Sequence, residues 1–243
     1  MFPLLRVPSY ERFVASAQGT ATARAIVSRF RATLHGADGI PAVGGALLVG
    51  NHTLFGIDSF ILGALMALET RRSMSWLAER NLFRIPTIGL ALRYVGAVPG
   101  TPDDAVRLLR AGHLVGVYPG GVDDSFKLAS ERYVLKWGER AGFARVAIAA
   151  GVPIVPIAAT GVDDLFEVRS RETWLGRRLM GSARYDFPLP ANLIPRNVPL
   201  DYHVLPSIET SGSVDHAAHV ETVRTRTVEA LESVLRPFRE RRA

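Results

Sequence analysis

Cysteine is absent from the 243 residues, which excludes disulfides, thiolate metal sites, iron–sulfur clusters and a cysteine nucleophile. Lysine occurs only as Lys127 and Lys136, so arginine supplies the other 27 of the 29 basic residues. An apolar run of the roughly 20 residues that a membrane-spanning helix needs is also missing. The longest uncharged apolar stretch, residues 146–161, is interrupted by Gly151 and two prolines and is typical of two buried strands joined at residues 151–153.

The common catalytic signatures are missing as well. The sequence has no G-x-S-x-G elbow, no G-x4-G-K-[ST] loop, no H-E-x-x-H and no G-x-G-x-x-G. His216 and His219, with Asp215 and Glu221 nearby, have a spacing that permits metal binding. Two histidines are common on solvated helix faces, however, so no metal site is predicted.

The basic excess is 29 − 23 = +6. It reflects either GC-rich coding or attraction to phosphate on nucleotides, lipid headgroups or nucleic acid. No long basic run is interleaved with aromatic residues, so nucleic acid is not expected as a partner. Residues 1–7 are apolar apart from Arg6 and lack the features of a signal peptide.

Periodicity predicts an α/β fold, with a single domain in which helices flank a mostly parallel central sheet. We expect strands at residues 46–50, 74–78, 114–118, 154–159 and 201–205. We expect helices at residues 59–68, 86–94, 102–112, 133–150 with a break at Gly142, 169–181 and 214–239. Thr101 is expected to cap the third of these helices, and residues 185–206 are expected to be a loop apart from their one strand.

Residues 1–35 are expected to be an amphipathic helical segment that precedes the main domain over residues 36–243. Ile26, Val27, Phe30 and Leu34 share one face at helical spacing. That face fits a protein core or a membrane surface about equally well, and the free apolar end at residues 1–5 favours membrane contact slightly.

The stretch over residues 50–58 is the first candidate site. His52 follows a buried strand at the carboxyl end, where α/β sheets place their ligands, and Asp58 opens the next helix. On an unbroken helix the offset of six would turn Asp58 about 120° away, but Gly56 permits a bend. If the side chains meet, Asp58 orients His52 as a general base for a hydroxyl nucleophile. The alternative is a helix-capping aspartate beside an ordinary loop histidine.

The stretch over residues 115–124 is the second candidate. A buried strand ends in Tyr118 and Pro119, and the bare backbone N–H groups of the following Gly120 and Gly121 could hold a phosphate or an oxyanion. The alternative is a plain tight turn.

Four blocks, in order, resemble the glycerolipid and lysophospholipid acyltransferase family, specifically its monoacylglycerol/diacylglycerol-acyltransferase-like branch. They are Asn51-His52 with Asp58, residues 79–89 leading to 96–100, residues 117–121, and residues 151–156. Two departures stand out. The usual His-x4-Asp spacing is His-x5-Asp here, and the glutamate usual after the proline of the third block is absent, with Asp123 and Asp124 following instead.

The resemblance implies that residues 36–243 are an acyltransferase domain with the acyltransferase fold of the glycerol-3-phosphate acyltransferase type. It implies acyl transfer from acyl-coenzyme A or acyl carrier protein to a hydroxyl of lysophosphatidate, another lysophospholipid, or a mono- or diacylglycerol, with His52 as base and Asp58 orienting it. The candidate substrate-binding residues are Asn51, Thr53, Arg84, Arg93, Tyr118, Pro119, Gly120, Gly121 and Lys127. No metal or redox cofactor is expected. A thioesterase and a non-catalytic lipid-binding protein remain alternatives, and a cytoplasmic protein bound peripherally to the membrane surface is expected.

Overall fold

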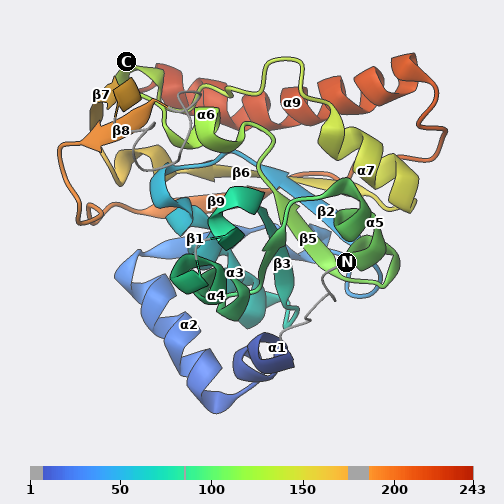
Figure 1. Cartoon of the computed structure of the whole chain (residues 1–243), viewed down its shortest axis with the longest axis horizontal. Helices are drawn as coiled ribbons and strands as arrows, with labels where there is room; N and C mark the ends of the chain where they lie inside the picture. The colour runs from blue at the N-terminus through green and yellow to red at the C-terminus, as the bar shows by residue number, and fades with distance from the viewer. Residues whose placement is uncertain (1–7, 85, 175–185, 243) are drawn as a thin grey trace.

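Helices and strands alternate along the chain in the computed structural model, which describes residues 8–84, 86–174 and 186–242 (Figure 1). The strands are β1 (Ala32–His35), β2 (Ala46–Gly50), β3 (Met74–Ala78), β4 (Ala97–Pro99), β5 (Leu114–Val117), β6 (Ile154–Thr160), β7 (Val168–Glu172), β8 (Phe187–Pro190) and β9 (Leu200–Val204). The helices are α1 (Pro8–Val14), α2 (Ala17–Arg29), α3 (Ile57–Glu69), α4 (Pro86–Tyr94), α5 (Pro102–Arg110), α6 (Gly121–Ser125), α7 (Gly142–Ala150) and α9 (Ala217–Glu240).

The central sheet has the strand order β1-β9-β6-β2-β5-β3-β4, and every neighbouring pair is parallel except β6 and β9. β2 lies in the middle, with Leu47 opposite Val115 of β5 on one side and Ile154 of β6 on the other. Because these three strands run the same way, the loops that leave them meet at one edge of the sheet. β7 and β8 form a separate antiparallel pair.

Helices cover both faces of the sheet because side chains alternate along each strand. Leu47 and Val49 of β2 pack with α5, α7 and α9, whereas Ala46 and Leu48 pack with α2, α3 and α4. Figure 1 shows the same arrangement, with α9 and α7 above the sheet and α2 and α4 below it. The predicted single α/β domain with a mostly parallel sheet is confirmed.

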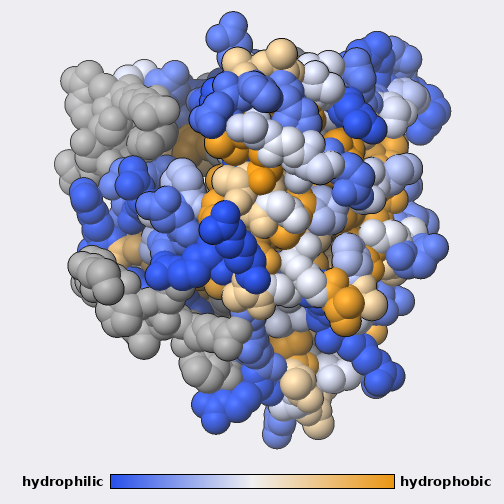
Figure 2. All heavy atoms as spheres, turned by 90° about the vertical axis from the view of Figure 1, so that its right-hand side faces the viewer, coloured by the Kyte–Doolittle hydropathy of each residue, from blue (hydrophilic) through white to orange (hydrophobic). Residues whose placement is uncertain are grey.

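In the part of the chain that the structure describes, no helix is both long and apolar enough to cross a membrane. Figure 2 shows the side of the molecule that carries α5 and α7. Hydrophobic atoms on this side are interspersed with hydrophilic ones, as on an ordinary protein surface.

Most predicted elements are confirmed, with the boundaries of β2, β3 and α4 as expected. Thr101 caps α5, since its hydroxyl accepts a hydrogen bond from the Asp104 N–H at 3.1 Å. Two expectations in the first half of the chain are corrected. Leu34 is not helical, because α2 ends at Arg29 and residues 32–35 pair with β9 as an edge strand. The short strand β4 was not predicted.

Three expectations in the second half are also wrong. Only Gly142–Ala150 of the predicted helix over 133–150 is helical, so residues 146–150 are not a strand either. Residues 169–172 belong to β7 rather than to a helix, and residues 175–181 lie outside the described ranges. The predicted loop over 185–206 contains β8, the partner of β7. Residues 1–7, expected to contact the membrane, also lie outside the described ranges.

Candidate active site

The side chains of His52 and Asp58 meet at the carboxyl edge of β2. His52 Nδ1 lies 2.9 Å from Asp58 Oδ2. Two consecutive left-handed residues between them, Phe55 with φ 62° and Gly56 with φ 67°, turn the chain back before α3 begins. The bend that the x5 spacing requires is therefore present, and it involves Phe55 as well as the predicted Gly56.

The pair is shielded from solvent, with the His52 side chain 17% exposed and Asp58 buried. Burial by itself lowers the pKa of His52, but the charge of Asp58, the hydrogen bond to it and the charge of Asp124 together raise that pKa above its ordinary value. With Nδ1–H donating to Asp58, the neutral imidazole has its lone pair on Nε2. This arrangement is that of an oriented general base.

Tyr118 lies directly against the imidazole. Its ring stacks on that of His52, with centroids 4.1 Å apart and an interplanar angle of 11°, and it also stacks with Trp76. Burial, followed by the charge of Asp58, raises the pKa of Tyr118 well above its ordinary value, so the phenol stays neutral. The structure therefore places Tyr118 against the plane of the imidazole, and its predicted contact with substrate stays a prediction.

Asn51 and Thr53 fasten the His52 loop to the neighbouring strand β6 and the loop after it. The Asn51 side chain donates to the Ala159 carbonyl at 2.9 Å and accepts from the Ala159 N–H at 2.8 Å. The Thr53 hydroxyl donates to the Val162 carbonyl at 3.0 Å. Both side chains are buried, and their polar groups form hydrogen bonds with backbone groups. Their predicted contact with substrate stays a prediction.

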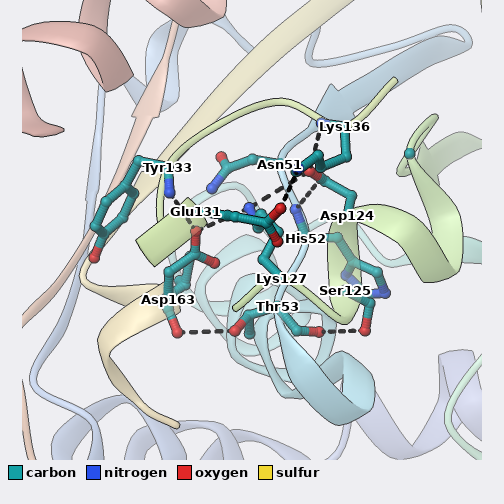
Figure 3. A network of polar contacts seen from close by, with 12 residues as sticks. Asn51, His52, Thr53, Asp124, Ser125, Lys127, Glu131, Tyr133, Lys136 and Asp163 are labelled. Carbon is teal, nitrogen blue, oxygen red and sulfur yellow. Dashed lines mark hydrogen bonds and ion pairs between the residues drawn. The ribbon is translucent and has the colours of Figure 1, made fainter. Parts of the chain in front are cut away.

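Asp124, for which no role was predicted, lies beside His52 (Figure 3). Its Oδ2 accepts the His52 N–H at 2.9 Å, and its Oδ1 accepts the Lys136 N–H at 3.1 Å. Lys127 Nζ lies 3.4 Å from Asp124 Oδ1 and 2.8 Å from Asp163 Oδ2. Asp124, Lys127 and Asp163 are all buried, and the ammonium lies between the two carboxylates, so the formal charge of the three groups is 1 − 2 = −1.

Lys127 remains protonated in this network. Burial lowers its pKa, but Asp124 and Asp163 outweigh burial and raise the pKa to about 12. Its predicted contact with a substrate phosphate is untested, and the structure places its ammonium between two carboxylates. The network continues from Asp163, which accepts the Tyr133 N–H at 2.7 Å.

Replacing Asp124 by asparagine is expected to lower the free energy of unfolding by about 2 kcal/mol. The substitution leaves Lys127 with one carboxylate, and it forces an amide NH2 against either an N–H donor or the ammonium. Asp123→Asn is the matched control, because Asp123 is exposed and pairs with Arg140 at the surface. Urea unfolding of both variants measures the difference, and equal stabilities would contradict a structural role for the buried charge.

One glycine N–H of the second candidate is engaged within its own turn. The Gly121 N–H donates to the Tyr118 carbonyl at 2.9 Å, and the His52 N–H is taken by Asp124. Gly120 faces Asp124 and Trp137, while the half-buried Pro119 joins this turn to Tyr118. The predicted oxyanion or phosphate contact of these amides stays a prediction.

Gly120→Ala is expected to lower the free energy of unfolding by about 1–3 kcal/mol. A Cβ at position 120 would lie 2.2 Å from Asp124 Cβ and 2.9 Å from Trp137 Cδ1, and both neighbours are buried. Gly142→Ala is the control, since a Cβ there meets nothing within 4 Å and the residue begins α7. Thermal unfolding should separate the two variants, and a Gly120→Ala protein as stable as Gly142→Ala would be inconsistent with this packing.

Arg84 and Arg93, which were predicted to bind substrate, have no contact with this polar network among the described residues. Arg84 is exposed, and Arg93 of α4 places its guanidinium over the Phe83 ring at 5.3 Å. Among the described residues no group of three or more histidine or carboxylate side chains could hold a metal ion. His216 precedes α9 as its N-terminal cap residue, and His219 lies in the first turn of that helix.

The fold resembles that of a solved enzyme. The 1-acyl-sn-glycerophosphate (LPA) acyltransferase PlsC from Thermotoga maritima superimposes with a TM-score of 0.56 at 14% sequence identity. The superposition covers 93% of this chain and 87% of that one. It shows that the two proteins share a fold, as the sequence motifs implied.

Sequence comparison gives nearer relatives. A human protein named DGAT1/2-independent enzyme synthesizing storage lipids is 35% identical over 154 residues, which are 63% of this chain and 47% of that one. An uncharacterized protein of Mycobacterium tuberculosis is 33% identical over 177 residues, 69% of this chain and 49% of that one. The chain thus spans about half the length of the curated relatives it matches.

A family model described as Acyltransferase matches residues 31–160. That range is more than half of the chain, and it contains β2, α3, the His52–Asp58 pair and the turn after β5. The chain therefore belongs to the Acyltransferase family.

Proposed function

We propose that this protein transfers a fatty acyl group from an acyl thioester to a hydroxyl of a glycerolipid, with His52 as the general base and Asp58 as the residue that orients it. The observation that carries the proposal is the 2.9 Å contact between His52 Nδ1 and the buried Asp58 carboxylate, at the ligand-binding edge of the sheet. Family membership supplies the reaction class.

The chemistry requires one base and no covalent enzyme intermediate. Neutral His52 takes the proton of the acceptor hydroxyl on Nε2 as the oxygen attacks the thioester carbonyl. Asp58 remains ionised and stabilises the imidazolium that forms. When the tetrahedral intermediate collapses, the C–S bond breaks and the departing sulfur takes the proton back from His52. An ester and a thiol result, and the enzyme returns to its starting state.

A lysophospholipid is the first candidate acceptor, as in the named reaction of the structural neighbour. A mono- or diacylglycerol is the second candidate. The His-x5-Asp spacing resembles that of the neutral-glycerolipid branch, and the name of the human relative refers to storage lipids, so both favour it. The proposed donor is acyl-coenzyme A or acyl carrier protein, and the proposed location is the cytoplasmic face of a membrane.

A transfer assay read by mass spectrometry tests the proposal. The purified protein is given palmitoyl-coenzyme A with a pool of lysophospholipids, monoacylglycerol and diacylglycerol. A new acylated lipid is expected, and its mass identifies the acceptor. Free fatty acid as the sole product would indicate a thioesterase, while lipid binding without turnover of either donor would indicate a binding protein.

A further inference from the structure

We propose that the loop over residues 191–197 docks this protein on an anionic lipid surface, with Leu193 and Ile194 entering the interface. The proposal deepens the proposed function, because an enzyme that acylates glycerolipids must take them from a membrane. It differs from the expectation for residues 1–35 in that the apolar contact comes from Leu193 and Ile194, while Arg29 and Arg31 contribute charge. Binding to a lipid surface can be measured without any acyl transfer.

Leu193 and Ile194 are large apolar side chains of the kind that proteins usually bury, yet both lie at the surface. Leu193 and Ile194 are each 77% exposed, and they are consecutive. The loop that carries them is well anchored. The Asn192 side chain donates to the Leu165 carbonyl at 2.9 Å, and the Arg196 N–H donates to the same carbonyl at 3.0 Å. The exposure therefore belongs to a fixed loop.

The topology places this loop at the edge of the sheet that carries His52. β9 is antiparallel to β6, so the residues before β9 lie beside the carboxyl end of β6, and β2 ends at the same edge. The contacts agree with this placement. Leu165 precedes Phe166, whose ring meets that of the exposed Phe55 at 5.4 Å, and Phe55 follows His52 by three residues.

Positive charge surrounds the two apolar residues. Arg29 and Arg31, at the end of α2 and before β1, donate to the carbonyls of Pro195 at 3.5 Å and Asn197 at 3.2 Å. Both side chains are exposed, and among the described residues neither has a carboxylate partner. Their charge is therefore available to an anionic surface.

The other charged residues near the loop, Arg169, Arg196 and Glu167, do not cancel the positive charge of Arg29 and Arg31. Arg169 and Arg196 both pair with Glu167, whose pKa they hold below its ordinary value, so that carboxylate stays ionised. Four arginines and one glutamate give 4 − 1 = +3 around the loop. An exposed apolar pair together with basic charge is the combination that reversible binding to anionic membranes requires.

Vesicle sedimentation tests the proposal with the full chain and no substrate. Vesicles of phosphatidylcholine mixed with phosphatidylglycerol in a roughly three-to-one ratio are compared with vesicles of phosphatidylcholine alone. The Leu193→Asp/Ile194→Asp protein is expected to lose binding to the mixed vesicles by roughly tenfold or more. Arg29→Gln/Arg31→Gln is expected to reduce the preference for mixed over neutral vesicles, also by roughly tenfold.

The matched control is Val43→Asp. Val43 is 84% exposed, but it precedes β2 and so lies at the opposite edge of the sheet. This variant should bind as the unchanged protein does. Equal binding by the loop variant, or no binding by the unchanged protein, would overturn the proposal. So would light scattering that shows a dimer dissociated by the loop variant, because the apolar pair would then bind a second copy.

These measurements are separable from the proposed reaction. If vesicle binding depends on the loop but no lipid is acylated, the docking proposal holds and the proposed function fails. If the loop variant binds vesicles normally and acylation proceeds, the docking proposal alone fails.

Discussion

His52→Ala is expected to reduce acyl transfer by at least about 10²-fold, since loss of a general base usually costs that much. The alanine cannot take the proton of the acceptor hydroxyl. The rate of ester formation with saturating donor and acceptor measures the effect.

The substitution should leave the fold intact, which makes the result interpretable. The His52 backbone N–H still reaches Asp124, and Asn51 and Thr53 still fix the loop to the β6 side. Circular dichroism should therefore match that of the unchanged protein. Near-normal transfer by such a folded variant would refute the role of His52.

Asp58→Asn is expected to lower kcat by about 10²–10⁴-fold, because the amide no longer fixes the productive imidazole tautomer. It should also change the pH dependence. In the unchanged enzyme the pKa of His52 is raised, so kcat/KM should increase with pH through a pKa above about 6.5 and then level off. Without the Asp58 charge, burial dominates and the pKa falls, so the rising limb moves to lower pH.

The loss of kcat together with the shift of the pH limb distinguishes a failure to orient the His52 imidazole from a general loss of structure. A variant that merely unfolds in part would lose activity at every pH without moving the limb. Asp58→Glu keeps the charge and is expected to keep the limb above about pH 6.5 even where its longer side chain lowers kcat. An Asp58→Asn limb at the same pH as in the unchanged enzyme would exclude the proposed coupling.

The sequence predicts the centre of this fold better than its edges. β2 and β3 are short apolar runs with clear ends, and Thr101 followed by proline marks the start of α5 in the usual way. At the edge, Leu34 fits the period of a helix and that of a strand, and pairing with β9 decides between them. Local periodicity contains no information about that partner, which lies over 160 residues further along the chain.

The candidate site shows the same division between local and long-range information. The His52–Asp58 contact could be foreseen as a possibility because Gly56 permits a bend, but the left-handed Phe55 could not, since the aromatic side chain disfavours that conformation. The bonds of Asp124 to His52 and of Asp163 to Tyr133 join segments that are distant in sequence. Carboxylates in such positions look like ordinary surface charges until the sheet brings the loops together.

The left-handed turn at Phe55 and Gly56 bears on how related proteins are sought. In this chain five residues separate His52 from Asp58, and the two with positive φ turn the backbone so that the imidazole and the carboxylate remain in contact. The number of residues between the histidine and the aspartate is therefore a poor search criterion, because the turn can absorb an inserted residue. A search pattern with a fixed gap of four would overlook this protein, whereas one based on the distance between the two side chains would find it.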